Sequence, residues 1–333
     1  MNKPHGEGID RKAARIRLAG LLRISEPFIE KVRLRRKSIA KTGRVFRKNW
    51  MGMLGVAILL VFVVMAAFPA QIMWVFSTVG GWEYPYEPND IVGPYGPGTD
   101  PSPEHWFGTD QRGNDILART IYGARVSLTI GIVATAVSMG LGALVGLLSG
   151  FWGGWRDEVL MRVTDVFLVL PWLVLMIVLA AVLPGGDSVT KVIIVIGITG
   201  WSGTARIVRA QVLSVKKRAF VERARAVGAG DLHIVRKHIF PNVFPIIFAN
   251  AILTVALSIL SESALSFIQL GPVAEEVVTW GNMLDDAINS GAMENGFYLW
   301  VMVPGFCIVF IVLGFTFIGY ALDEIFNPKL RKR

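Results

Sequence analysis

Two acidic side chains lie inside long apolar stretches of the sequence, where a charge is costly. Asp165 falls within Val159–Leu183, and Glu262 falls within Val243–Phe267. An ionisable group inside an apolar span indicates a functional role by default. Asp165 stands six residues before Pro171, near one end of its stretch, which favours a polar contact between helices or subunits over contact with a substrate. For Glu262, a place on a substrate pathway and a structural role stay equally open.

Two further groups have metal-binding side chains without a metal-binding spacing. His233 and His238 are five residues apart, whereas two ligands on one helix face are four apart. His105, Asp110 and Asp115 match no recurring calcium or zinc pattern. We therefore expect no metal and no cofactor, and exposed or hydrogen-bonded roles for the two internal histidines.

The composition indicates a membrane protein without ATPase chemistry of its own. Of the 333 residues, 53% are hydrophobic and 18% are charged, whereas about 25% is usual for soluble domains, and the mean hydropathy is +0.52. No Gly-x4-Gly-Lys-[Ser/Thr] phosphate loop occurs in the sequence, so we expect no ATP hydrolysis by this chain. Its single cysteine, Cys307, excludes an internal disulfide framework.

The apolar stretches are long enough to cross a bilayer. A hydrocarbon core about 30 Å thick requires about 20 mostly apolar residues in a helix. A short stretch, Val192–Gly200, is apolar for only nine residues, and hydropathy alone leaves it ambiguous. Five stretches are long enough: Met53–Trp74, Leu128–Ser149, Val159–Leu183, Val243–Phe267 and Leu299–Leu322.

The distribution of charge decides the ambiguous stretch. The first 48 residues contain 15 Lys/Arg against four acids, and Ser202–Asn242 contains nine against two. Phe76–Thr120 contains two against seven, and Leu270–Tyr298 contains none against five. Because positively charged segments stay in the cytoplasm, Val192–Arg209 must cross the membrane. We therefore predict six spans with both termini cytoplasmic, and the net charge of +9 reflects topology rather than nucleic-acid binding.

This topology divides the chain into five parts. They are a cytoplasmic arm (1–50), a first transmembrane helix (51–75), an external loop (76–120), a five-helix core (121–322) that includes a cytoplasmic loop (214–242), and a cytoplasmic tail (323–333). The basic arm has two interpretations, a helix on an anionic membrane face or a partly disordered segment that only orients the first span.

Two regions of this layout carry more specific local predictions. In the external loop, Thr109 or Asp110 is predicted to cap a short helix whose apolar residues, Ile116 among them, pack on the outer membrane surface. In the second span, glycines recur every four residues, a spacing that suits close helix packing. They are Gly142, Gly146 and Gly150.

The cytoplasmic loop has the pattern of two short helices around a glycine turn. Glu222–Val227 contains mostly good helix formers, and Gly228 and Gly230 allow a sharp turn. Asp231 is predicted to cap a second short helix that ends before Pro241. Such a loop would form a rigid knob for docking to another protein. A solvated basic connector is the alternative.

The same loop resembles the EAA loop of ATP-binding-cassette (ABC) importer permeases. The matching residues are Glu222, Ala224, Gly228, Ile239, Pro241 and Asn242, and the departures are Arg223 and Phe240. Further blocks resemble the oligopeptide/dipeptide permease branch, from about Trp106 to the C-terminus. These are Gly108–Asp110, Ile121–Leu128, Gly150–Trp155, Glu262–Phe267 and Trp280–Leu284.

The resemblance implies an all-α, polytopic type I ABC importer permease fold. It also implies that a coupling helix, here Val221–Ala229, inserts into an ATPase subunit. The implied partners are a second homologous permease subunit, two ATP-binding subunits, an extracellular or periplasmic solute-binding protein and membrane lipid. Peptides are the favoured cargo, with oligosaccharides or nickel as alternatives. An ATPase-independent secondary transporter is the competing class, and it would have no reason to build a docking knob.

Overall fold

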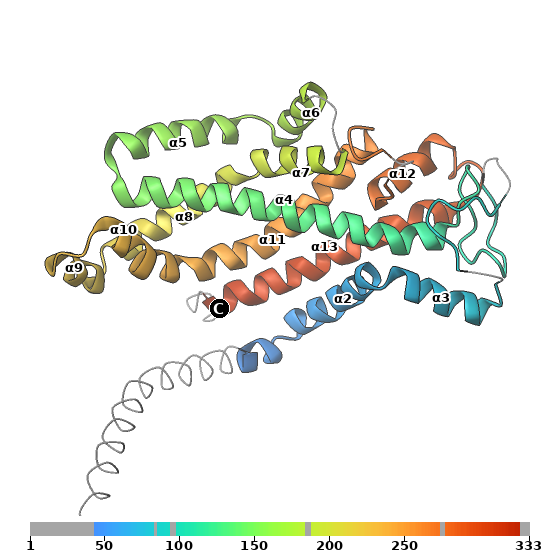
Figure 1. Ribbon diagram of the computed structural model, residues 1–333, viewed down its shortest axis with the longest axis horizontal. Coiled ribbons are helices and arrows are strands. Elements are labelled where there is room, and N and C mark those ends of the chain that lie inside the picture. The colour runs from blue at the N-terminus through green and yellow to red at the C-terminus, as the bar shows by residue number, and fades with distance from the viewer. Residues whose placement is uncertain (1–42, 83–84, 94–97, 184–187, 274–276, 327–333) are drawn as a thin grey trace, which may run out of the picture. The chain divides into compact units, whose positions relative to one another are not determined.

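A computed structural model of the chain describes residues 43–82, 85–93, 98–183, 188–273 and 277–326. The chain divides into two compact units, Met1–Trp50 and Met51–Arg333. Most of the N-terminal arm and the end of the C-terminal tail lie outside the described residues, and so does the amphipathic helix predicted for the arm. The second unit carries the features described below (Figure 1).

The second unit is built from helices, which confirms the all-α fold class. The described residues form isolated β-bridges, as between Thr99 and Thr109, but no named strand. The elements are α2 (Trp50–Ala67), α3 (Pro69–Gly80), α4 (Ile116–Trp152), α5 (Gly154–Val169), α6 (Trp172–Val182), α7 (Ser188–Thr199), α8 (Trp201–Lys216), α9 (Ala219–Ala226), α10 (Asp231–Ile234), the π-helix η1 (Val235–Ile239), α11 (Phe240–Phe267), α12 (Trp280–Asn289) and α13 (Tyr298–Phe326).

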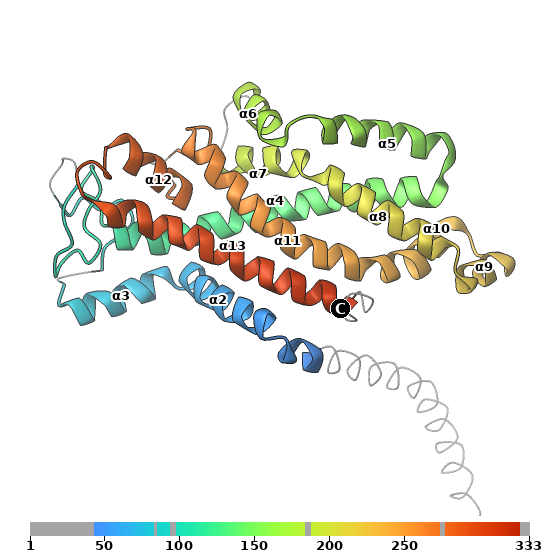
Figure 2. The same cartoon turned by 180° about the vertical axis from the view of Figure 1, so that it is seen from behind.

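The long helix α4 runs along the unit and packs against α8 and α11 (Figures 1 and 2). It begins after Asp115, whose Oδ1 accepts a hydrogen bond of 2.8 Å from the Ala118 N–H. The separate short helix predicted after Thr109 or Asp110 is wrong, because Ile116 starts a helix of 37 residues that continues through the span. No proline interrupts this run. The side chain that caps the helix is therefore Asp115.

The glycines of α4 bring its backbone close to α8, as their spacing predicts. A Cβ on Gly142 would lie 2.7 Å from the Trp201 carbonyl oxygen, and one on Gly146 would lie 2.6 Å from that of Ala205. The same atom on Gly150 would lie 3.0 Å from the Arg209 carbonyl oxygen. Any side chain at these positions would push the two helices apart. The predicted close packing is confirmed.

Two predicted spans are broken in the structure. Val159–Leu183 is not one helix, because α5 and α6 meet at Pro171 with a bend of 94°. α7 and α8 meet at Gly200 with a bend of 41°. The described residues contain four helices long and apolar enough to cross a membrane, or six if each bent pair is one span. The six predicted spans are therefore reached only if each bent pair counts as one span.

The first predicted span, Met53–Trp74, is also divided. α2 ends at Ala67, and α3 begins at Pro69, the first residue of the next helix. Proline lacks the N–H that would continue the hydrogen-bond ladder, so it stands well at the start of a helix and poorly inside one. The helix that is long and apolar enough to span is therefore α2 itself.

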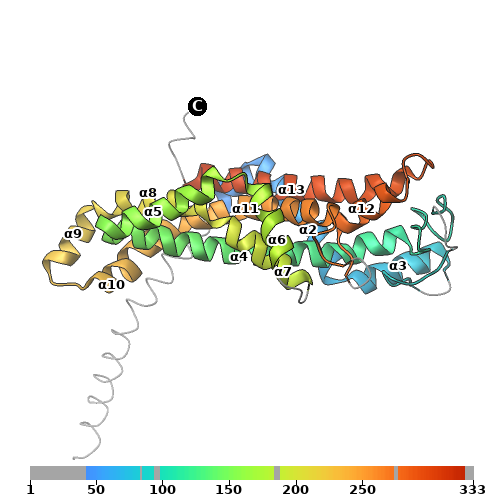
Figure 3. The ribbon, with the colours of Figure 1, turned by 90° about the horizontal axis from the view of Figure 1, so that it is seen from above.

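The two ends of the second unit carry different structures. At one end lie α9 and α10, and at the other lie α12 and the segment before α4 (Figures 1 and 3). The segment before α4 is irregular over its described residues, as its prolines predict. The helix α4 extends toward both ends (Figures 1 and 3).

Candidate functional site

The predicted docking loop begins with α9 and a glycine turn. The Ala229 N–H donates to the Ala224 carbonyl oxygen at 3.0 Å, and the Gly228 N–H donates to that of Arg225 at 3.0 Å. Gly228 has φ +84°. This is the hydrogen-bond pattern of a Schellman turn, which needs a residue in the left-handed region at its fifth position. The predicted turn at Gly228 is confirmed.

The segment after this turn differs from the prediction. Gly230, not Asp231, is the residue before the helix, and no side-chain cap is present. The second short helix does not end before Pro241, because α10 continues through η1 into α11. Pro241 lies two residues after η1, inside the continuous helix that α10, η1 and α11 form. The loop is thus continuous with a membrane-spanning helix.

The residues of the loop separate into an exposed tip and a buried base. Glu222, Gly228, Asp231, Pro241 and Asn242 are exposed. Their exposure leaves these positions open to a partner.

The base of the loop is buried. Ile239 has no exposed surface, and Ala224 is half-buried. Ile239 packs in an apolar cluster with Val221 and Ile234. Ile239 therefore holds the loop on the helices below it and is not open to a partner.

Two apolar residues at the tip were not found by sequence reasoning. Val227 is 83% exposed and Leu232 is 63% exposed, on the two sides of the Gly228 turn. Both side chains are therefore open to contact with another molecule. The available signal was their position next to the glycines, in a segment otherwise rich in arginine and lysine.

The helices beneath the tip hold it through packing and ionic contacts. Val208, Val212 and Val215 of α8 belong to the same buried cluster as the loop base. Arg209 of α8 makes two hydrogen bonds to Asp157 of α5, at 2.6 and 2.7 Å. The base of the loop is therefore packed on α8 and α11 through this cluster.

The two internal histidines lie on α10 and η1, where His233 is exposed and His238 is half-buried. The rings of His233 and His238 are 6.1 Å apart, and the His238 ring also faces Phe220. Within the described residues, no group of three His, Cys, Asp or Glu side chains is placed to hold a metal ion. The pair therefore contributes ring contacts to the loop.

The two acids inside the spans both make contacts between helices. Asp165 on α5 forms an ion pair of 2.6 Å with Arg206 on α8. Glu262 on α11 is fully buried, and it accepts hydrogen bonds from Ser127 on α4 at 3.3 Å and from Ser266 at 2.8 Å. Asp165 is thus tied to the helix that leads into the loop, and Glu262 to the interface of α4 and α11.

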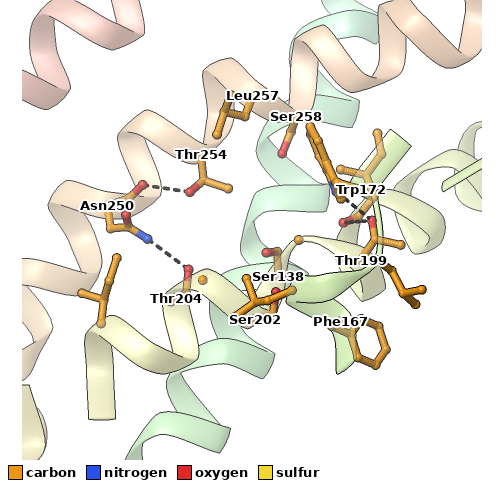
Figure 4. A pocket seen from close by; sticks show the side chains of 16 residues that line it. Ser138, Phe167, Trp172, Thr199, Ser202, Thr204, Asn250, Thr254, Leu257 and Ser258 are labelled. Carbon is orange, nitrogen blue, oxygen red and sulfur yellow. Dashed lines mark hydrogen bonds between the residues drawn. The ribbon is translucent and has the colours of Figure 1, made fainter. Parts of the chain in front are cut away.

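A cavity lined by apolar side chains and by several hydroxyl or amide groups lies where the two broken spans meet α4 and α11 (Figure 4). Its volume is about 350 Å³, and residues of α4 to α8 and α11 line it. Asn250 Nδ2 donates to Thr204 Oγ1 at 3.0 Å, and Trp172 Nε1 donates to Thr199 Oγ1 at 3.3 Å. Sequence reasoning missed this cavity, because its polar residues are single positions far apart in the chain.

The opposite end of the unit contains a buried ionic network. Arg119 is 1% exposed and pairs with Asp110 and with Asp286 of α12, the second at 3.5 Å. Burial raises the pKa of Asp286 above its ordinary value, although Arg119 and Arg112 act in the opposite direction. Asp286 therefore carries its charge only at the cost of desolvation.

The residues weighed as a metal site divide between two contacts at this end. His105 Nδ1 lies 3.1 Å from Asp115 Oδ2. Asp110 instead pairs with Arg119, and its Oδ1 accepts hydrogen bonds from the N–H groups of Arg112 and Asn114. The structure thus brings together His105 and Asp115 but places Asp110 in the neighbouring ionic network.

Comparisons with known proteins agree across most of the chain. A family model described as a binding-protein-dependent transport system inner membrane component matches residues 142–332. The oligopeptide transport system permease protein OppC of Bacillus subtilis (strain 168) is 37% identical over 288 residues, which cover 86% of this chain and 88% of that protein. The dipeptide transport system permease protein DppC of the same strain is 36% identical over 232 residues, 70% of this chain and 71% of that protein.

One solved structure is also similar in backbone. A chain of the MetNI methionine ABC transporter, in inward-facing conformations, has a TM-score of 0.48 at 18% sequence identity, covering 64% of this chain and 95% of that chain.

Proposed function

The chain belongs to the family of binding-protein-dependent transport system inner membrane components, and from this premise we propose that it is one permease subunit of an ATP-driven importer of di- or oligopeptides. The peptide cargo is supported by relatives named as oligopeptide and dipeptide permeases over most of their length. The chain would form half of the translocation pathway. A second, homologous permease subunit would form the other half.

The orientation that fits this role places the α9–α10 end in the cytoplasm. The charge distribution supports it, because Ser202–Asn242 carries nine Lys/Arg against two acids, and Leu270–Tyr298 carries five acids and no Lys/Arg. Both termini would then be cytoplasmic. A solute-binding protein would deliver its cargo at the end that contains α12.

The exposed tip of the docking loop on its buried base is the observation that carries the coupling role. In this proposal, Glu222, Gly228 and Asp231 meet an ATP-binding subunit, while Ala224 and Ile239 hold the loop rigid. Pro241 and Asn242 lie exposed where the loop passes into α11. Two ATP-binding subunits would move the two loops as rigid bodies and so switch the pathway between its openings. ATP hydrolysis belongs to those partners.

The test is transport-coupled ATP hydrolysis by the assembled importer. The chain is purified with its two ATP-binding subunits and second permease subunit, and the stimulation of ATP hydrolysis by peptide-loaded binding protein is measured. Glu222→Lys and Gly228→Pro should each reduce that stimulation by about tenfold or more, the range of typical coupling energies. The stability of the permease should change little with Glu222→Lys, since this side chain is exposed.

Glu158→Lys is the matched control. Glu158 is an exposed glutamate on α5, outside the docking loop, so this variant should keep the wild-type stimulation. Unchanged stimulation in both Glu222→Lys and Gly228→Pro would reject the coupling role of the loop, and no stimulation of the wild-type assembly would reject the ATP-coupled importer in favour of an ATPase-independent carrier.

A further inference from the structure

A groove lies where the chain turns from α4 into α5 (Figure 1). Gly153 and Gly154 form this turn, with φ +68° and +60°. The groove has a volume of about 380 Å³, within the range for small-molecule sites, roughly 300–1,000 Å³. It belongs neither to the docking loop nor to the cavity at the broken spans. The residues that line it are Leu148, Trp152, Trp155, Arg156, Val159 and Leu160.

The length of α4 places this groove at one boundary of the membrane. Residues 126–152 of α4 carry no charged side chain, and at about 1.5 Å per residue they extend about 40 Å. This length matches a bilayer with its headgroup regions, about 40–45 Å thick. Arg125 precedes the uncharged run, so Trp152 at its other end falls among the lipid headgroups. Tryptophan is enriched at that depth, because its ring is apolar and its indole N–H is polar.

The groove has a polar end and an apolar end. The polar end is at the turn, where the two tryptophans and Arg156 lie. The apolar end lies one helical turn deeper in the membrane, with Leu148 on α4 and Val159 on α5. Aliphatic side chains continue this surface by a further turn on both helices, since Leu144 is 55% exposed and Val163 is 46% exposed. The groove thus changes from polar to apolar in the same direction as a phospholipid does.

The polar end presents hydrogen-bond donors that the described part of the chain leaves unpaired. Arg156 is exposed, and its guanidinium makes no ion pair or hydrogen bond with the described residues. The adjacent acid, Asp157, instead pairs with Arg209 at 2.6 Å. Glu158 is two residues from Arg156 and so points about 200° around the helix from it. Neither tryptophan of the groove has an indole hydrogen bond to a described residue. A positive charge and two N–H groups are therefore available to a ligand.

A lipid phosphate is the acceptor that matches these donors at this depth. Its oxygens can accept two parallel hydrogen bonds from a guanidinium, which makes arginine a preferred phosphate ligand. An acyl chain gains little by moving from the bilayer to the groove, because both surroundings are apolar. The headgroup must therefore decide which lipid binds. A zwitterionic headgroup would bring its own cation near Arg156, whereas an anionic one would not.

We propose that this groove binds an anionic glycerophospholipid, with its phosphate on Arg156 and an acyl chain along Leu148 and Val159. The inference requires only that the chain lies in a membrane, as its family does. It uses neither the peptide cargo nor the coupling role. The choice of the cytoplasmic leaflet alone rests on the orientation proposed above.

Native mass spectrometry of the full chain, delipidated in detergent, tests this proposal. Dioleoylphosphatidylglycerol and dioleoylphosphatidylcholine are titrated, because they share their acyl chains and differ in net charge. The wild type should bind the first phosphatidylglycerol about tenfold more tightly, the effect of hydrogen bonds to a charged group. Arg156→Gln should remove this preference and leave phosphatidylcholine binding unchanged. Since Arg156 is exposed, this variant should fold as well as the wild type.

Two further variants make the test specific. Arg162→Gln is the matched control, because it removes another exposed arginine of α5 that does not line the groove. This variant should keep the wild-type preference for phosphatidylglycerol. Trp155→Ala removes one wall of the groove, and it should weaken the first binding step of both lipids about threefold. Trp155 is 71% exposed, so its loss should not unfold the chain.

Several results would overturn the proposal. These are equal affinity of the wild type for the two lipids, a preference that survives Arg156→Gln, and an equal loss of preference in Arg162→Gln. Loss of the preference on assembly with the second permease subunit would also overturn it, because that subunit would then cover the groove. The titration of the chain alone needs neither ATP nor partners. Loss of ATP-driven uptake with an intact, Arg156-dependent preference would therefore reject only the proposed function.

Discussion

The two ends of the second unit treat charge in opposite ways. At the α9–α10 end, Glu222, Asp231 and the neighbouring arginines are exposed around an apolar tip. At the α12 end, Arg119 is 1% exposed and is neutralised by Asp110 and Asp286 from other segments of the same chain. One end therefore leaves its charges open to partners, whereas the other uses charge to fix its own structure.

This difference predicts how substitutions of charged residues will act at each end. A buried charge network must be complete to be tolerated, because each member that loses its partner is left desolvated. Exposed charges gain little from one another in water. Substitutions at the α12 end should thus act on stability, and substitutions at the α9–α10 tip should act on function.

Removal of Arg119 should have the largest effect. Arg119→Met leaves Asp110 and Asp286 without their shared buried partner, and it should destabilise the permease by about 3–5 kcal/mol. The measurement is thermal or denaturant unfolding of the purified chain in detergent. Arg112→Gln is the control, since Arg112 is 31% exposed and lies 3.7 Å from Asp286, and it should cost about 1 kcal/mol or less. Equal effects of the two substitutions would contradict the role assigned to the buried network.

Loss of the close packing between α4 and α8 should have the next largest effect on stability. Gly146→Ala would place a Cβ 2.6 Å from the Ala205 carbonyl oxygen and 2.7 Å from Val208 Cβ, so α4 and α8 must separate. The expected cost is about 2 kcal/mol, measured by the same unfolding experiment. Gly140→Ala is the matched control, because an added Cβ at Gly140 meets nothing within 4 Å. A neutral Gly146→Ala would show that the helices are not in close contact.

The glycine turn at the tip should show a smaller, local effect. Gly228→Ala forces a residue with a Cβ into φ +84°, which costs about 1 kcal/mol. Hydrogen exchange of the α9–α10 amides should therefore become faster, with global unfolding almost unchanged. Gly230→Ala is the control, since Gly230 has φ −65° and open space around it. Equal exchange in the two variants would indicate that the turn is not held in the left-handed region.

The smallest effect is a pH dependence at the α12 end. Burial raises the pKa of Asp286, so the folded state holds this proton more tightly than the unfolded chain. The resulting stability is complete below the unfolded pKa of about 4 and is lost as the pH rises through the folded pKa. The wild type should therefore lose stability relative to Asp286→Asn as the pH rises from about 4 toward neutrality. Parallel unfolding curves for the two proteins would contradict a raised pKa.

Local chemistry made part of this structure predictable from sequence. The spacing of Gly142, Gly146 and Gly150 predicts the close approach of α4 to another helix, because glycine has no side chain to keep two helix backbones apart. Gly228 predicts the turn for a similar reason, since few other residues adopt a positive φ. Both predictions depend on properties of a single residue type.

Features that depend on contacts between residues far apart in the sequence were predicted wrongly or were not predicted. Pro241 was expected to end a helix, but α10, η1 and α11 continue through it as one helix, with the π-helical turn η1 just before the proline. Pro171 marks an interruption, but its 94° bend depends on packing and not on periodicity. The cavity gathers Ser138, Ser202 and Asn250 from three helices, and no local pattern connects them. The roles proposed for the loop residues stay predictions.

The central claim is that the α9–α10 tip meets an ATP-binding subunit, and crosslinking tests it most directly. A photoreactive amino acid is placed at Val227, which is 83% exposed, or at the exposed Asn295 near α12, in the assembled importer. We predict a crosslink to an ATP-binding subunit from position 227 and none from position 295. A crosslink to that subunit from position 295, or its absence from position 227, would contradict the account.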